Sequence, residues 1–347
     1  MSQIKTKNTK KTVMKVFLWI FLTLLIVIVA AAGAAFWYVN DKIGRMNNVE
    51  LNEEELGVSE NENLDKYRNV AIFGVDSRND DYGKGNRSDC IIIASINIKT
   101  HAVKLVSVYR DTYVQIEGHG LDKITHAYSY GEAKLALKTL NENLDLNITD
   151  FVTVNFDAVA DAVDALGGIK MKITTAELQY INGYIDETSR VTGKKSEHIT
   201  TAGTHILDGV QAVAYSRIRY TSGGDYKRTE RMRDVITAMI AKLKTKSVTQ
   251  INKIADKILP KVYTNLDLTD LLSMLPALAS FNVAESTGWP YDNKGALING
   301  VSYGIPVTLE SNVEKLHKEV FEDEDYEVPT KIKEISNKIV KKSGYSK

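Results

Sequence analysis

The sequence predicts an α/β fold, a layered domain of strands and helices, preceded by a single N-terminal transmembrane helix. Short β-branched runs alternate with helical stretches of ten to fifteen residues, which is typical of strands and helices packed in layers. Polar loops rich in Asn, Asp and Gly follow several of these runs, as expected for ligand loops at strand ends. An uncharged stretch of more than twenty residues lies near the N-terminus.

The N-terminal segment predicts a membrane location. Five lysines within residues 1–15 precede the uncharged run Val16–Tyr38. A helix of that length crosses a bilayer, and the preceding lysines place the N-terminus in the cytoplasm. A cleaved secretory signal is the alternative, because Ala30–Ala35 offers small residues to a signal peptidase. The length of the run favours a retained single-pass anchor, and in both cases the remaining chain is extracellular.

Composition limits the class of protein. The 347 residues carry no formal net charge, so bulk electrostatics do not predict nucleic-acid binding. Cys90 is the single cysteine, which excludes a disulfide within the chain and suits a Gram-positive cell surface. The expected segments are a basic cytoplasmic end (1–15), the anchor (16–39), an acidic juxtamembrane stalk (40–66), a globular extracytoplasmic domain (67–322) and a charged tail (323–347).

A first candidate site lies between two predicted strands, residues 70–75 and 91–96. The loop that joins them offers two carboxylates and two guanidiniums at one edge of the sheet. Carboxylates ligate a divalent cation, while arginines donate paired hydrogen bonds to phosphate oxygens. An ordinary solvated hairpin connection is the alternative interpretation. The residues concerned are Asp76, Arg78, Arg87 and Asp89.

The next predicted strand adds to the same edge. Ala102–Val108 alternates apolar and polar residues and is followed closely by Arg110. Residues 113–116 extend the predicted pairing. Lys123, in a glycine-bearing turn, is another cation able to reach a phosphate. The two histidines nearby, at positions 119 and 126, are too isolated in sequence to predict a histidine metal site.

The remaining elements follow from periodicity and turn signals. Residues 174–201 are polar and poorly patterned, so they are predicted to form an irregular excursion or flexible flap. The expected helices are 130–144, 157–166, 233–244, 251–259, 268–278 and 309–321, and the expected strands are 151–156, 169–173, 281–283 and 296–301.

Four arginines in paired spacing form the strongest chemical feature. Arg217 and Arg219 alternate, so in extended backbone both side chains point the same way. Arg228 and Arg231 share one face near the start of a predicted helix that Asp225 opens, where backbone N–H groups favour an anion. A solvated surface would balance lysine with glutamate, so this pattern favours a multiply charged phosphate ligand.

The motifs GVDSR, RSD, SVYRDTYV, G-x-GLDKI, D-G-x-x-A-x-x-Y-x-R-x-R and D-x-x-R-x-x-R occur in that order between residues 67 and 240. This order resembles the LytR-CpsA-Psr family. The resemblance implies a membrane-anchored extracytoplasmic transferase whose fold is a three-layer αβα sandwich with a central mixed sheet. Such an enzyme moves an anionic glycopolymer, teichoic acid or capsular polysaccharide, from a polyprenyl diphosphate carrier to peptidoglycan and releases polyprenyl phosphate.

The resemblance also implies roles for individual residues. Asp76 and Asp89 would hold Mg²⁺, with Mn²⁺ as the alternative, on the diphosphate, and Arg110 would lie nearest the reacting phosphorus. Tyr109 stands where the family usually has proline, and Met232 stands where it usually has glutamine. The arginines that would surround the diphosphate are Arg87, Arg217, Arg219, Arg228 and Arg231. The candidate acceptor of the hydroxyl proton is Asp76 or Asp225. The candidates to line a lipid groove are the helices near 131–144, 157–166 and 233–244.

Two other functions use the same residues. A non-catalytic regulator that binds polyprenyl-linked or wall polymers needs the same arginines, and the Met232 departure is its basis. A pyrophosphatase would use water on the same diphosphate. Dependence on the acceptor separates the three functions, because only a transferase makes a polymer–glycan product.

Overall fold

The computed structural model describes residues 47–77, 81–266 and 280–346. The predicted transmembrane helix, Arg78 and the predicted helix 268–278 lie outside these ranges. Within the described ranges, no helix combines the length and apolar character needed to cross a membrane.

A seven-stranded mixed sheet forms the middle layer. Its central strand, β2, runs antiparallel to β3 and parallel to β7, and β4 runs antiparallel to β3 and parallel to β11. The first three strands predicted from the sequence are therefore neighbours in the sheet. In spatial order the strands are β1 (Asn47–Asn48), β10 (Tyr263–Thr264), β7 (Asp150–Val154), β2 (Tyr67–Val75), β3 (Ser88–Asn97), β4 (Ala102–Val108) and β11 (Asn282–Trp289).

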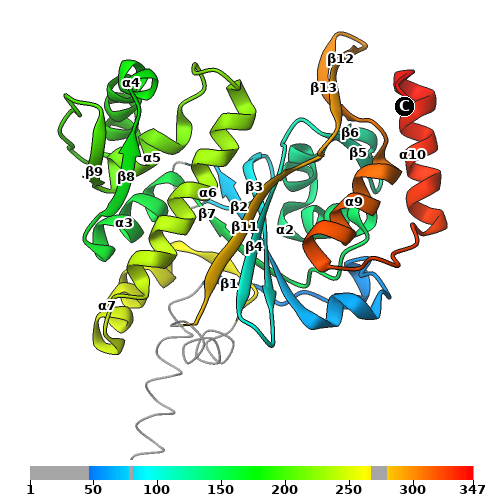
Figure 1. Ribbon diagram of the computed structural model, residues 1–347, viewed down its shortest axis with the longest axis horizontal. Helices are drawn as coiled ribbons and strands as arrows, with labels where there is room; N and C mark the ends of the chain where they lie inside the picture. Colours follow the sequence, from blue (N-terminus) through cyan, green and yellow to red (C-terminus); the bar gives the residue numbers. More distant parts are fainter. Residues whose placement is uncertain (1–46, 78–80, 267–279, 347) are drawn as a thin grey trace, which may run out of the picture. The chain divides into compact units, whose positions relative to one another are not determined.

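Helices cover both faces of this sheet, which confirms the predicted αβα layering (Figure 1). One face packs against α2 (Ile124–Leu144), α9 (Leu309–Phe321) and α10 (Thr330–Ser343). The helices on the other face are α3 (Phe156–Leu166), α6 (Gly224–Leu243) and α7 (Val248–Ile258).

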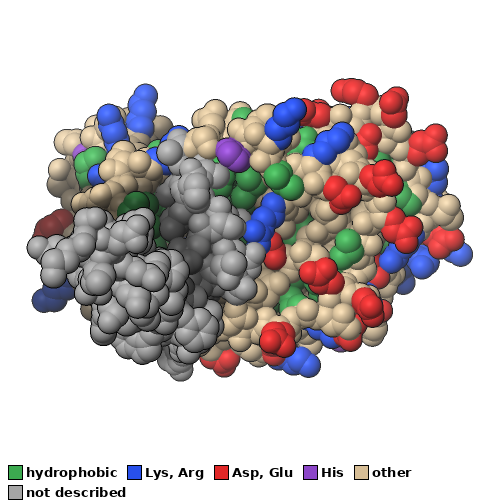
Figure 2. Space-filling view, turned by 90° about the horizontal axis from the view of Figure 1, so that it is seen from below, with side chains coloured by type: hydrophobic (Ala, Val, Ile, Leu, Met, Phe, Trp, Pro, Cys, Tyr) green, Lys and Arg blue, Asp and Glu red, His purple; other side chains and the backbone are tan. Residues whose placement is uncertain are grey.

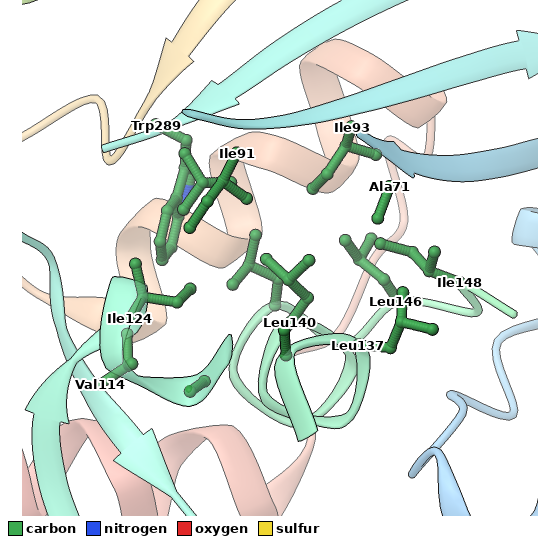
Figure 3. Close-up of a cluster of buried hydrophobic side chains, with 14 of the residues drawn as sticks. Ala71, Ile91, Ile93, Val114, Ile124, Leu137, Leu140, Leu146, Ile148 and Trp289 are labelled. Atoms are coloured by element: carbon green, nitrogen blue, oxygen red, sulfur yellow. The ribbon is translucent and has the colours of Figure 1, made fainter. Parts of the chain in front are cut away.

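Alternation along β3 explains why two separate cores form. Ile91 and Ile93 point into the cluster shared with α2 and α9, whereas Ile92 contributes to the smaller cluster under α6. Each isoleucine is buried on its own face of the sheet, and burying such a side chain contributes about 1.5–3 kcal/mol to the free energy of folding. Figure 3 shows the larger cluster, with Ala71, Ile91, Ile93, Val114, Ile124, Leu137, Leu140, Leu146, Ile148 and Trp289 labelled.

A third hydrophobic cluster lies at one end of the α/β layers. It is built by α4 (Thr175–Thr192), α5 (Gly209–Arg217) and a hairpin of β8 (Ile169–Ile173) and β9 (Gly203–Leu207). The prediction that residues 174–201 form an irregular flap is therefore wrong, because most of that stretch is α4.

A closed cap and an apolar face stabilise α4. Thr174 and Glu177 form a complete capping box at its N-terminus. Ile181 and Ile185 lie one turn apart, and both are fully buried within the third cluster. Polar residues occupy more than half of the helix, so its apolar pattern is weak in the sequence.

Both predicted peripheral segments belong to the folded domain. The predicted stalk spans residues 40–66, of which 47–66 are described. There Leu56 and Leu64 are fully buried; Leu56 directly follows the short helix η1 (Glu53–Glu55), and Leu64 lies within η2 (Glu62–Lys66). The predicted charged tail instead contains α10, whose Ile335 and Ile339 pack into the larger cluster. Ile332, Ile335 and Ile339 are spaced three and four residues apart, so α10 has an apolar face that packs on the core although the segment is highly charged.

Two hairpins project from the layers. Residues 113–116 do not extend the main sheet as predicted. They form β5 (Tyr113–Ile116), which pairs with β6 (Gly120–Lys123) in a separate sheet. The second hairpin joins β12 (Asn293–Ile298) to β13 (Val301–Pro306).

Acidic side chains gather over the half of the domain that carries α9 and α10 (Figure 2). A cavity of about 680 Å³ lies there, between the end of α2 and the connection from α9 to α10. Its acidic lining repels a polyanion, so this cavity is not the predicted phosphate site. The acidic lining residues are Glu60, Glu142, Asp145, Asp323, Asp325 and Glu327.

Candidate active site

A β-bulge at the ends of β2 and β3 positions the first two carboxylates. Gly74 pairs with Cys90 and Val75 pairs with Ser88, so Asp89 is the extra residue of the bulge. Asp76 directly follows β2, and both aspartates line one pocket of about 310 Å³. Gly74 allows the close approach of the strands, because a Cβ there would lie 2.8 Å from Cys90 Cβ.

Arg110 reaches this edge from the end of β4. Its Nη1 donates to Asp89 Oδ1 at 2.7 Å, and its Nε lies 3.7 Å from Asp111 Oδ2. Lys123 Nζ lies 2.9 Å from Asp111 Oδ1, so Lys123 neutralises Asp111 beside Arg110 and does not line the pocket. Burial opposes the charge of Arg110, but the adjacent Asp89 carboxylate and its hydrogen bond outweigh it and raise the pKa of Arg110.

The N-terminal part of α6 supplies a buried guanidinium, that of Arg228. Arg228 Nη2 lies 2.9 Å from Asp225 Oδ1 and donates to the Asp89 backbone oxygen at 3.4 Å. Burial lowers the pKa of Arg228, while the nearby Asp225 raises it. Within the described part of the chain, its buried Nε has no hydrogen-bond partner. An unpaired N–H on a buried charge is costly, and such groups cluster at functional sites.

The α5–α6 connection supplies two further arginines. Arg217 is the last residue of α5 rather than part of an extended segment, which corrects the geometry expected from its alternation with Arg219. Its guanidinium pairs with Glu187 at 2.8 Å and lies 4.7 Å from the ring centre of Phe156. Arg219 is 43% exposed and lies 3.9 Å from Asp225, and both arginines line the same pocket.

Arg231 lies elsewhere, although it shares a helical face with Arg228. Its side chain is 2% exposed, and its Nε donates to Glu177 Oε1 at 2.8 Å. The other two nitrogens donate to Ile218 O at 3.0 Å and to Thr221 Oγ1 at 2.6 Å. Every guanidinium nitrogen of Arg231 is thus used within the protein. The structure gives this arginine the role of a clamp on the α5–α6 loop instead of a place in the pocket.

The last of the predicted cations is Arg87, which is exposed in the loop before β3. Its backbone oxygen accepts from the Asp89 N–H at 3.1 Å, so Arg87 borders the bulge. It is absent from the pocket lining. The pocket lining therefore combines Asp76, Asp89, Arg217, Arg219 and Arg228. Arg110 is not among the lining residues and is linked to the pocket through its ion pair with Asp89.

An apolar cavity of about 300 Å³ adjoins this charged pocket. The two share four lining residues, namely Gly74, Cys90, Phe156 and Met232. Helices α3 and α6 line the apolar cavity, as expected for two of the three candidate helices. The third candidate, residues 131–144, lies in α2 on the opposite face of the sheet and does not line it.

Sequence reasoning missed four residues of the pocket wall. They come from α3, α4 and the α5–α6 loop, and the missed helix α4 explains two of them. Tyr180 and Tyr184, which are four residues apart, were an available signal for α4. The four residues are Phe156, Tyr184, Glu187 and Tyr220.

The carboxylates fit a magnesium ion that shares its ligands with a substrate. Among the described residues, no three His, Cys, Asp or Glu side chains cluster as a metal cage. Mg²⁺ does not need one, because it keeps several waters and binds through one or two carboxylates plus substrate phosphates. Asp76 and Asp89 facing one pocket with arginines provide that donor set.

A charged pocket adjoins an apolar cavity at the strand ends of the αβα sandwich, and this arrangement suits an amphiphile with an anionic head. The chain belongs to the LytR_cpsA_psr family, whose model matches residues 34–320. This result confirms the family resemblance noted in the motifs.

Several characterised relatives are similar over most of the chain. It is 31% identical to the polyisoprenyl-teichoic acid–peptidoglycan teichoic acid transferase TagT of Bacillus subtilis, over 85% of this chain and 92% of that protein. It is 30% identical to the corresponding transferase TagU of Enterococcus faecalis, over 84% of this chain and 91% of that protein. A solved structure of YwtF (TagT) with bound octaprenyl pyrophosphate lipid superposes with a TM-score of 0.52 at 25% identity, covering 83% of this chain and 94% of that one.

Proposed function

We propose that this protein transfers an anionic glycopolymer from a polyprenyl diphosphate carrier to peptidoglycan. The observation that carries the proposal is the junction of the charged pocket with the apolar cavity through Gly74, Cys90, Phe156 and Met232. A diphosphate suits the arginine-lined side, and a prenyl chain suits the other. The transferase names of the relatives and the octaprenyl pyrophosphate in YwtF (TagT) support the same substrate class.

In the proposed reaction, a hydroxyl oxygen of the peptidoglycan glycan attacks the sugar-proximal phosphorus of the donor. A new phosphorus–oxygen bond forms, and the bond to the bridging diphosphate oxygen breaks. The hydroxyl proton passes to a protein carboxylate, and polyprenyl phosphate leaves with the bridging oxygen. The products are a phosphodiester-linked polymer and polyprenyl phosphate, so charge and atoms balance.

Arg110 is the proposed catalytic residue. Phosphoryl transfer depends mainly on positioning and on neutralising charge that develops on phosphoryl and leaving oxygens. Arg110 is held by Asp89 at 2.7 Å, so its guanidinium is already oriented before the donor binds. Arg217, Arg219 and Arg228 line the pocket and are proposed to bind the diphosphate.

Asp76 and Asp89 are the residues proposed to hold Mg²⁺, or Mn²⁺ in its place. When bound, the ion would neutralise diphosphate charge and polarise the phosphoryl oxygens. Asp76 is also the stronger of the two candidates for proton acceptor. Asp225 already accepts from Arg228, whereas Asp76 is exposed in the pocket.

We further propose that residues 16–39 anchor the chain in the cell membrane with its N-terminus in the cytoplasm. The charge pattern before Val16 and the length of the apolar run support this orientation. The folded domain would then act on the extracellular side, where peptidoglycan and lipid-linked polymers meet.

The test uses the full-length chain in detergent micelles with a synthetic prenyl diphosphate-linked glycopolymer, a peptidoglycan oligomer and Mg²⁺. Mass spectrometry should detect a phosphodiester-linked product that disappears in Asp89→Asn or after chelation of the metal. Asp150→Asn is the matched control, because Asp150 pairs with Arg68 at 2.7 Å at the opposite end of the sheet. That variant should retain activity.

Two other outcomes would replace the proposal. Phosphate-terminated polymer formed without acceptor would identify a pyrophosphatase. Tight donor binding without product, across several donors and acceptors, would identify a regulator that binds lipid-linked polymers. Met232 lies at the junction of the two cavities, so a Met232→Gln variant tests whether this side chain limits turnover.

A further inference from the structure

An exposed aromatic side chain stands at the mouth of the charged pocket. Tyr220 lies in the α5–α6 loop, lines the pocket, and is 74% exposed. Large aromatic side chains are usually at least half buried in a folded domain, because their exposed surface is costly in water. The exposure of Tyr220 therefore needs an explanation.

The loop that carries Tyr220 is held in place on both sides of it. Arg231 donates to Ile218 O at 3.0 Å and to Thr221 Oγ1 at 2.6 Å. Glu177 orients Arg231 through a buried ion pair of 2.8 Å. The Ile218 backbone and the Thr221 side chain, on either side of Tyr220, are thus held by the same buried arginine, while the Tyr220 ring is exposed to solvent.

The surroundings of Tyr220 combine an aromatic surface with a cation. The ring centroids of Tyr180, on α4, and Tyr220 are 6.0 Å apart, and the ring planes make an angle of 42°. Tyr184, one helical turn further along α4, lines the pocket itself. Arg219, the residue before Tyr220, is 43% exposed. An apolar face next to a hydrogen-bond donor matches a sugar ring, which has C–H faces and hydroxyl edges.

We propose that Tyr220, supported by Tyr180, forms a saccharide subsite that packs against one hexopyranose ring beside the diphosphate pocket. Arg219 would donate hydrogen bonds to the hydroxyl or acetamido oxygens of the same ring. This inference rests on the proposed function, since the diphosphate must bind in the adjacent pocket. The ring belongs either to the first sugar of the donor or to the acceptor glycan, and both present the same chemistry.

Two probes separate sugar binding from diphosphate binding in the full-length chain. The first is octaprenyl diphosphate, and the second is the same lipid carrying one N-acetylhexosamine. Tyr220→Ala should weaken binding of the sugar-bearing probe about fivefold to tenfold and leave binding of octaprenyl diphosphate unchanged. Tyr220→Phe should bind both probes normally, because the ring face and not the hydroxyl makes the contact. Leu297→Ala is the matched control, as Leu297 is also 74% exposed.

The acceptor is tested in the transfer assay. If the KM for the peptidoglycan oligomer rises in Tyr220→Ala while both lipid probes bind normally, the ring belongs to the acceptor and the subsite stands. Equal weakening of both lipid probes, or no change in any of the three measurements, would overturn the subsite. If the unaltered protein binds neither lipid probe, the proposed function fails first, and the subsite fails with it.

Discussion

Arg110 and Asp89 join the ends of two neighbouring strands through one hydrogen-bonded ion pair of 2.7 Å. Asp89 lines the pocket, and its position as the extra residue of a β-bulge brings it within reach of Arg110. Both side chains are about one-quarter exposed, Asp89 at 28% and Arg110 at 24%. The pair is therefore accessible to a ligand and still oriented before one binds.

Arg110→Ala should reduce transfer about a hundredfold to a thousandfold, because loss of one preoriented group that stabilises the transition state has that effect. Donor binding should change much less, so the loss should appear in turnover at saturating donor. Arg68→Ala is the matched control, since Arg68 forms a pair of the same length with Asp150 outside the site. A large loss in both variants would mean that general destabilisation, not catalysis, explains the result.

Glu177→Gln should destabilise the folded domain by about 3–5 kcal/mol, because it leaves the Arg231 guanidinium buried and without its counter-charge. Thermal unfolding followed by near-ultraviolet circular dichroism measures the change. Glu314→Gln removes one partner of the surface pair with Lys318 and should cost no more than about 1 kcal/mol. Equal effects of the two variants would contradict the clamp.

Stability should fall in acid partly through Glu177. Burial raises the pKa of this carboxyl, but hydrogen bonds from Thr174 and the pair with Arg231 lower it more, so the folded pKa lies below the ordinary 4.5. A lowered folded pKa means that the contribution is complete above about pH 4.5 and is lost as pH falls through the folded pKa. Melting temperatures measured from pH 7 to pH 3 should decline less steeply in Glu177→Gln than in the unaltered chain. Parallel curves would contradict this assignment.

Ala162→Phe should fill part of the apolar cavity and weaken binding of octaprenyl diphosphate by about tenfold or more, since the prenyl chain would lose buried area. Dimethylallyl diphosphate, which has a short tail, should bind as before. Val248→Phe adds the same ring at a position on α7 that is 76% exposed and should affect neither ligand. Equal losses for the long and short lipids would exclude this cavity as the prenyl site.

Strand ends were predictable because β-branched runs and polar loops mark them directly. Residues 70–75, 91–96 and 102–108 all lie in neighbouring strands, and for this reason Asp76, Asp89 and Arg110 meet at one edge. Local sequence was sufficient to place these three side chains, because Asp76 and Arg110 lie within two residues of the ends of their strands and Asp89 lies inside its strand.

The clamp and α4 were not predictable by the same reasoning. Spacing places Arg228 and Arg231 on one helical face, but only the position of Glu177, 54 residues away in sequence, determines which of them is buried in an ion pair. In α4, polar residues outnumber the buried ones, so the apolar pattern was weak. The capping-box residues Thr174 and Glu177 were the available signal.

The placement of Asp76 directly after β2 and of Asp89 within β3 has a consequence for sequence divergence. Each carboxylate is positioned by its own strand, so the segment between them does not set their separation. Tyr82 is buried in that segment, whereas Lys84 and Gly85 are exposed, so added residues fit best at this exposed turn. Lengthening a loop costs little, because doubling a flexible loop adds only about 0.6 kcal/mol of closure entropy. Insertions there can accumulate between related proteins and alter what the pocket rim recognises, while the spacing of the two carboxylates stays the same.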